Sequence, residues 1–262
     1  MAESLRLRNA REGPLPTLLL INGKAVGPGY GPTADHRDLS YTFQFNVIFA
    51  HLPEFLQGAA LTLGLALAGF WGGAPFALLL AFARTSGSKW IKRLAGGYVT
   101  FITNTPVLIH IWFLFYGLGD LGILLGKYTA VIIGLMAATS AYGCEIMRGG
   151  FLSVRRSEIE AAETLGFSRL QTVWYVIVPH IVKTVYPALA NYFIVLTLST
   201  SLAMIVGGEE LLGTAFNVAS ENYRHLEAVI VAAGLYVVIT FAVSLSLALV
   251  GRWAFRVKAK IF

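Results

Sequence analysis

Few side chains of this sequence are arranged for chemistry of their own. The chain has five histidines without metal-ligand spacing: His36, His51, His110, His180 and His225. Its single cysteine, Cys144, has no partner in the chain, so no disulfide framework exists. Neither a phosphate-binding loop nor a G-x-S-x-G nucleophile motif occurs; Gly122–Lys127 lacks the loop's spacing and is followed by Tyr128. The sequence therefore predicts no catalytic residue, no metal and no cofactor bound by this chain.

The most informative polar segment lies between Glu145 and Pro179. Glu145 and Arg148 are three residues apart, so on a helix they face one another and are expected to form a structural ion pair. Pro179 is expected to interrupt or kink the helix in which it lies, because proline has no N–H and its ring clashes with the preceding turn. The segment therefore predicts short helical pieces between two longer helices.

Two capping boxes divide this segment. Ser157 followed by Glu160 is the pattern in which a hydroxyl and a carboxylate each bind a free backbone N–H, which predicts a helix over Ser157–Gly166. Ser168 with Gln171 repeats the pattern and predicts the start of another helix. The sequence thus predicts a short helix with a defined beginning and end.

This short helix needs a surface to lean on, because an isolated helix of this length is unstable in water. Ala161 and Ala162 are small enough to permit close docking against a partner, and Leu165 lies on or near the apolar face. A surface helix packed on its own membrane domain would show the same pattern. The residues alone leave both interpretations open.

The elements that position this segment are long apolar runs. The chain is 56% hydrophobic and only 13% charged, whereas a soluble domain carries roughly a quarter charged residues. Five uncharged runs mostly reach the roughly 20 residues that a membrane-crossing helix needs: Phe55–Ala83, Leu94–Gly119, Tyr128–Cys144, Thr184–Gly208 and Ala228–Gly251. We predict an all-α membrane protein with five transmembrane helices and a short cytoplasmic helix between the third and fourth.

The distribution of basic residues predicts the orientation. Loops on one side of the membrane would hold Arg84, Lys89, Lys92, Arg93, Arg148, Arg155, Arg156, Arg169, Lys183, Arg252, Arg256, Lys258 and Lys260. The opposite loops hold only Lys127 and Arg224, which places the C-terminus in the cytoplasm and the N-terminus outside. The basic residues of the N-terminal tail fit this placement poorly. The net charge of +6 is explained by membrane topology, so no nucleic acid is expected as a partner.

The expected domain organisation follows from these runs. Residues 1–54 form a tail and interfacial segment, 55–252 the transmembrane domain, and 253–262 a cytoplasmic tail. In the first span, small residues fall four apart on one helix face: Ala60, Gly64, Ala68 and Gly72. Such a stripe favours close helix packing, either with another span of this chain or with another subunit.

Polar groups inside apolar spans mark a possible solute pathway, because they are costly in lipid. The candidates are Asn104, Thr105, Asn191, Ser199 and Thr200. Hydroxyl groups can also bind a carbonyl one turn back on their own helix, and asparagines can bind a neighbouring helix. Each candidate therefore has a structural interpretation as well.

The segment from Glu145 to Pro179 resembles the signature region of polar amino acid ABC permeases, the binding-protein-dependent inner-membrane components of type I importers. Their pattern is EI-x-RGG, then EAA-x-x-LG, then a downstream proline. The matching residues are Glu145, Arg148, Gly149, Gly150, Glu160, Ala161, Ala162, Leu165, Gly166 and Pro179. The similarity extends over roughly 56–252 and leaves the N-terminal tail unexplained.

The resemblance implies a permease subunit without enzymatic activity, with a coupling helix that converts closure of a partner ATPase into movement of the spans. The residues that it places in this role are Ser157, Glu160, Ala161, Ala162, Leu165 and Gly166. It further implies an ATPase dimer that binds ATP and Mg, a second permease subunit, identical or related, an extracytoplasmic solute-binding protein, and an inner-membrane location in contact with lipid.

The solute implied is an amino acid or a related small polar molecule. Many members carry charged residues where this chain has Leu198 and Ser199, and a basic residue near the position of Thr103–Asn104. A basic amino acid, an opine-like conjugate or another polar solute therefore all remain open. A secondary transporter would show inverted repeats or ionisable residues in several spans, which this sequence lacks. A non-transporting scaffold would need no coupling helix.

Overall fold

The computed structural model describes residues 19–21, 24–26 and 41–255. The first two ranges are short strands, β1 (Leu19–Ile21) and β2 (Lys24–Val26), which pair antiparallel. They belong to a unit that ends at Phe43, and a separate helical unit begins at Gln44. Most of the two tails predicted at 1–54 and 253–262 lies outside the described residues, so these boundaries stay predictions.

Within residues 44–255, which the structure describes, the helical unit contains four helical stretches that are long and apolar enough to cross a membrane. They are α3 (Leu52–Thr85), α7 (Lys127–Ser153), the stretch Arg169–Val206, and most of α12 (His225–Phe255). A fifth span is obtained if α4 (Lys89–Thr103) and the segment Val107–Asp120 count as one. A short helix, α2 (Phe45–Phe49), precedes α3. The structure thus confirms the predicted all-α membrane fold.

The second predicted span, Leu94–Gly119, is not continuous. The axes on either side of the break at Asn104–Pro106 differ by 96°. Pro106 cannot donate a backbone hydrogen bond and disfavours helical geometry at the residue before it, which explains the position of the break. Beyond it lie α5 (Val107–Trp112), the π-helical turn η2 (Phe113–Gly117) and α6 (Leu118–Asp120).

The third and fourth spans also differ from their predicted bounds. α7 continues past Cys144 to Ser153, because the charged side chains that follow are paired with one another. After α7 come α8 (Arg156–Thr164), α9 (Arg169–Thr172), the π-helical turn η3 (Val173–Ile177), α10 (Val178–Ser199) and the 3-10 helix η4 (Thr200–Val206). Pro179 lies in the first turn of α10 and does not interrupt the long helical stretch.

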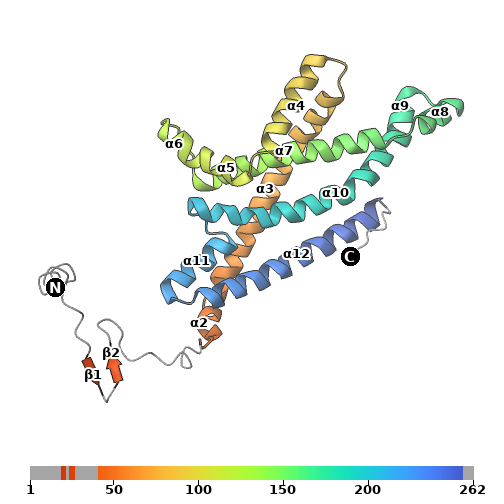
Figure 1. The fold of residues 1–262 in the computed structure, drawn as a ribbon. Helices are drawn as coiled ribbons and strands as arrows, with labels where there is room; N and C mark the ends of the chain where they lie inside the picture. Colours follow the sequence, from red (N-terminus) through yellow and green to blue (C-terminus); the bar gives the residue numbers. More distant parts are fainter. Residues whose placement is uncertain (1–18, 22–23, 27–40, 256–262) are drawn as a thin grey trace, which may run out of the picture. The chain divides into compact units, whose positions relative to one another are not determined.

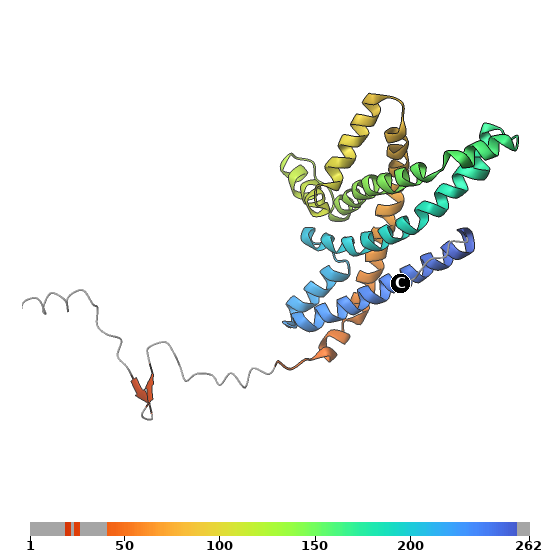
Figure 2. The same ribbon diagram turned by 45° about the vertical axis from the view of Figure 1, so that its right-hand side comes forward.

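Helices α7, α10 and α12 run roughly side by side, and α3 crosses them (Figures 1 and 2). The most extensive helix pairing, α3 with α7, depends on glycines. A Cβ at Gly69 would lie 2.6 Å from Leu135 Cβ, and one at Gly73 would lie 2.6 Å from the Met136 carbonyl oxygen. The backbones approach this closely only because both side chains are missing.

The small-residue stripe predicted at Ala60, Gly64, Ala68 and Gly72 is therefore not the main packing face of α3. Ala60 and Gly64 are exposed, and no neighbouring atom lies within 4 Å of a Cβ built on Gly64. Of the two glycines, Gly72 alone approaches another helix, against the side chain of Met136. The prediction of a contact within the chain is wrong for the first part of the stripe.

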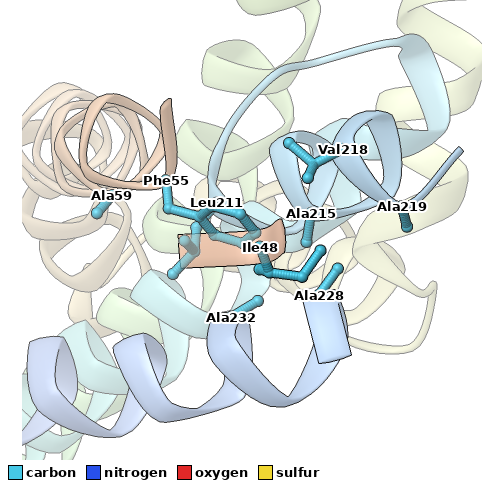
Figure 3. Close-up of a cluster of buried hydrophobic side chains, with 9 residues drawn as sticks. All are labelled: Ile48, Phe55, Ala59, Leu211, Ala215, Val218, Ala219, Ala228 and Ala232. Atoms are coloured by element: carbon cyan, nitrogen blue, oxygen red, sulfur yellow. The ribbon is translucent and has the colours of Figure 1, made fainter. Parts of the chain in front are cut away.

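Helix α11 (Leu211–Asn222) lies at the end of the helical unit opposite to α8 (Figure 1). It was not predicted from the sequence. Figure 3 shows the buried cluster that it forms with α2, α3 and α12: Ile48, Phe55, Ala59, Leu211, Ala215, Val218, Ala219, Ala228 and Ala232. Its N-cap is Glu210, a fully buried carboxylate that accepts hydrogen bonds from the backbone N–H groups of Leu212 and Gly213, both at 2.9 Å. Hereafter this is the α11 end, and the end that carries α8 is the α8 end.

Candidate functional site

The short helix α8 lies beyond the ends of α7 and α10 (Figure 1). It begins at Arg156, and its N-cap, Arg155, makes no side-chain capping bond. The predicted capping box at Ser157 is therefore wrong. Glu160 does not reach back to a backbone N–H, because its carboxylate accepts from Arg156 Nε at 2.9 Å one turn earlier.

The other end of α8 matches the prediction. Gly166 has a positive φ of 81°, a left-handed conformation that glycine adopts without steric cost. The Gly166 N–H donates to the Glu163 carbonyl at 2.9 Å, and the Phe167 N–H donates to the Ala162 carbonyl at 3.0 Å. These two bonds satisfy carbonyls at the helix end and turn the chain sharply.

The second predicted capping box, at α9, is confirmed. The Ser168 N–H donates to Gln171 Oε1 at 2.8 Å, and the Gln171 N–H donates to Ser168 Oγ. Because only four residues separate α8 from α9, the two helices form a compact turn at the α8 end. Helix α8 also packs on η3, so it leans on its own chain.

The residues predicted to couple to an ATPase divide between two faces of α8. Five of them are exposed: Ser157, Glu160, Ala161, Leu165 and Gly166. Leu165 is 75% exposed although it is apolar. Ala162 is only 4% exposed and faces the chain itself, so it cannot serve as a docking contact. The structure thus leaves one face of α8 open and uses the other for packing.

An ionic cluster holds α7 to the end of α3. Glu145 Oε2 accepts from Arg148 Nη2 at 2.7 Å, and Glu145 Oε1 accepts from Arg84 Nη1. The sequence indicated the partner three residues away on the same helix. It gave no signal for Arg84, whose pairing depends on how α3 crosses α7.

The predicted pathway residues do not form one cluster. Three hydroxyls bind carbonyls of their own helices: Thr105 to Phe101 at 2.8 Å, Ser199 to Val195 at 2.9 Å and Thr200 to Thr197 at 2.8 Å. Thr200 is also buried. Asn104 and Asn191 are exposed, although Asn104 Nδ2 donates to the Thr100 carbonyl at 2.7 Å. Of these five candidates, the two asparagines are the exposed ones.

Two tyrosines that the sequence did not single out connect the helices that carry these asparagines. The Tyr142 hydroxyl donates to the Thr103 carbonyl at 3.3 Å, next to Asn104. The Tyr142 ring stacks on that of Tyr192, with centroids 5.8 Å apart, and the Tyr192 hydroxyl donates to Thr139 Oγ1 at 3.4 Å. The sequence signal that could have identified them is a tyrosine in the middle of an apolar span, because its hydroxyl group needs a hydrogen-bond partner there.

This arrangement of helices defines the fold of the membrane subunit of an ABC importer. A crystal structure of an amino acid ABC transporter with histidines matches with a TM-score of 0.76 and 32% identity, covering 81% of this chain and 100% of that one. The MetNI methionine ABC transporter in an inward-facing form matches with a TM-score of 0.57 at 18% identity, which shows the fold alone. It covers 79% of this chain and 99% of that one.

The chain belongs to the family of binding-protein-dependent transport system inner membrane components, whose model matches residues 73–260. The glutamine transport system permease protein GlnP of Escherichia coli (strain K12) is 32% identical over 77% of this chain and 93% of its own length. The octopine transport system permease protein OccM of Rhizobium radiobacter is 32% identical over 72% and 81%. The nopaline transport system permease protein NocM of Agrobacterium fabrum is 31% identical over 79% and 90%.

Membership of this family settles the class of activity. The chain is a multi-pass inner-membrane permease subunit of an ABC importer and not an enzyme. In such importers a separate subunit hydrolyses ATP and a binding protein delivers the solute.

Proposed function

We propose that this chain moves an amino acid or an opine-like amino acid conjugate inward, driven by an ATPase dimer that docks on α8. One observation carries the proposal: α8 ends at the left-handed turn of Gly166 and has an exposed outer face beyond the ends of the membrane helices. The names of the relatives, which are glutamine, octopine and nopaline permeases, support this class of solute.

The docking surface consists of exposed residues of α8, Ser157, Glu160 and Ala161, together with the apolar side chain of Leu165 at the C-cap of the helix. Ala162 and Gly166 act indirectly, since the first seats α8 on the chain and the second ends the helix. A short helix with fixed ends transmits a displacement as a rigid body. ATP and Mg²⁺ bind to the partner ATPase in this proposal.

The solute pathway runs past the exposed amides of Asn104 and Asn191 and past Tyr142, which binds the carbonyl of Thr103 and stacks on Tyr192. None of these groups carries a charge, so recognition rests on hydrogen bonds to the solute's amide, ammonium or carboxylate groups. Thr105, Ser199 and Thr200 shape this wall by holding backbone carbonyls. A second permease subunit, identical or related, supplies the facing half.

The α8 end faces the cytoplasm, and the solute-binding protein meets the α11 end from outside. Support for this orientation comes from the basic residues at the α8 end, among them Arg84, Lys89 and Arg156. At the α11 end Lys127 is neutralised by an ion pair with Glu209 at 3.0 Å. The N-terminus then lies outside and the C-terminus inside.

The test is to express the chain with its genomic neighbours and compare Leu165→Asp with Leu124→Asp. Both leucines are exposed, at 75% and 87%, but Leu124 lies in the connection before α7, far along the chain from α8. We expect Leu165→Asp to lose the co-purifying ATPase and ATP-driven uptake of glutamine or octopine, whereas Leu124→Asp keeps both. Uptake without ATP by the purified chain alone would overturn the proposal.

A further inference from the structure

His180 lies where three elements meet at the α8 end. It belongs to the first turn of α10, and its ring contacts the last residue of α7 and a residue of α8. Nε2 is 3.1 Å from Ser153 Oγ, and Nδ1 is 3.4 Å from Glu158 Oε2. One side chain therefore touches both neighbours of α10 at this end.

The hydrogen-bonding capacity of the two partners determines which contact each nitrogen of the His180 ring can make. Ser153 Oγ donates its own hydrogen to the Gly150 carbonyl at 2.7 Å, so it offers a lone pair to His180 Nε2. The Glu158 carboxylate can only accept. The Nε2 contact is therefore a hydrogen bond that the ring donates, whereas the Nδ1 contact is an ion pair, at 3.4 Å, when the imidazole is protonated.

The setting of this contact separates it from an ordinary surface pair. The His180 and Glu158 side chains are 30% and 32% exposed, whereas those of the Arg156–Glu160 pair on the same helix are 91% and 60% exposed. Partial removal from water strengthens an ion pair, and a pair already held in place loses less side-chain entropy when it forms.

Next to this contact, α7 and α10 pack closely against one another at Gly150. A Cβ on Gly150 would collide with Val185 and would lie 3.2 Å from the Ile181 side chain. The two helices therefore cannot slide past one another at this level without separating. His180 joins α8 to this closed seam one turn further along.

We propose that His180 is a positioning residue that locks α8 to α7 and α10, so that the three elements move as one body. The inference rests on the proposed function, in which the ATPase displaces α8. Only Val154 and Arg155 connect α7 to α8, and a helix attached through such a short link could pivot about it. Beyond the turn to α9 and the packing on η3, the imidazole attaches α8 directly to α10, which opposes such pivoting.

The functional test compares three substitutions at His180 in the intact importer, reconstituted in vesicles. In His180→Asn the amide occupies the place of Nδ1 and keeps the Glu158 contact; in His180→Gln it occupies that of Nε2 and keeps Ser153; His180→Leu keeps neither. We expect all three to retain the ATPase. The amount of solute moved per ATP hydrolysed should fall about fivefold in His180→Leu and His180→Gln, which is at the low end of the couplings known between protein sites. In His180→Asn it should stay near the native value.

A second measurement does not depend on transport. Spin labels on Leu152→Cys in α7 and Thr164→Cys in α8, both exposed positions, report the distance between these helices in a Cys144→Ala chain. We expect one narrow distance distribution in the native background and a broad one with His180→Leu or Glu158→Ala. Should His180→Leu fail to fold, Glu158→Ala and Ser153→Ala still remove one contact each.

The outcomes separate the two proposals. An unchanged, narrow distribution in Glu158→Ala and in every folded His180 variant overturns the lock, whatever the importer transports. Equal solute moved per ATP in all three His180 variants and the native chain overturns it as well. Absence of ATP-driven uptake in the native complex, combined with broadening in the variants, overturns the proposed function and leaves the lock standing.

Discussion

The two ends of the helical unit are held together by carboxylates in opposite surroundings. At the α11 end Glu210 is fully buried and accepts from two backbone N–H groups and from the Tyr236 hydroxyl at 2.7 Å, without a basic partner among these donors. At the α8 end Glu145 and Glu158 are about one-third exposed and are paired with arginine or histidine.

This difference indicates which end can be remodelled. A buried carboxylate that loses its donors leaves unsatisfied groups in a dry environment, so the α11 end has one stable arrangement. Water can replace a partner at the half-exposed pairs, so rearranging them costs less. The α8 end is thus suited to move with an ATPase, and the α11 end to keep α3, α11 and α12 fixed.

The largest effect is expected from breaking the α11 end. Glu210→Ala removes the N-cap of α11 and the acceptor for Tyr236, so the free energy of unfolding should fall by about 3 kcal/mol. The neighbouring Glu209→Ala removes a carboxylate that is 59% exposed and should cost less than about 1 kcal/mol. Denaturant titration in detergent measures both; equal losses would show that Glu210 is not the structural anchor.

A smaller effect is expected at the seam under α8. Gly150→Ala inserts a methyl group against Val185 and should lower stability by about 2 kcal/mol, whereas Gly149→Ala meets no atom within 4 Å and should raise it by about 0.5 kcal/mol. Adding Val185→Ala should restore part of the loss. The same denaturant titration measures these changes. If Gly150→Ala left the free energy of unfolding unchanged, α7 and α10 would be loosely packed at this position.

The ionic cluster at the α8 end should respond to salt. Arg84→Ala is expected to lower the free energy of unfolding by about 1 kcal/mol at low ionic strength, because Glu145 keeps Arg148 as a partner. Screening by salt should reduce this difference, while the loss in Glu210→Ala should stay constant. Titrations at two NaCl concentrations test this, and a salt-independent Arg84 effect would contradict the contrast between the two ends.

The smallest effect on stability is expected on the outer face of α8. Glu160→Gln breaks a pair with Arg156 that is almost fully exposed on the arginine side, so stability should change by less than about 0.5 kcal/mol. A larger loss would mean that Glu160 supports the fold of α8 and is not available for docking.

The sequence predicted those parts of the structure that depend on neighbouring residues. The long apolar runs predicted the four continuous spans and the presence of the interrupted second span. Gly166 predicted the end of α8, and Ser168 with Gln171 predicted the start of α9. The family resemblance gave the class of protein. Each of these signals lies within a few residues of the structure that it specifies.

Features that depend on distant residues were missed. The partner of Arg84 lies 61 residues away, and the donors to Glu210 come from α11 and α12. At Ser157 the local rule failed because Arg156 competes for Glu160. On α3 the small-residue spacing indicated one face, but the crossing with α7 selected Gly69 and Gly73 on another.

The dependence of α3 on α7 has a consequence for membrane insertion. The ribosome completes Thr85 long before it reaches Lys127, and at about 5–20 residues per second this delay lasts seconds. Until α7 arrives, Gly69 and Gly73 present bare backbone to lipid or to the insertion machinery. The first span therefore enters the bilayer without its principal partner, and its final tilt is set only after the third span has joined it.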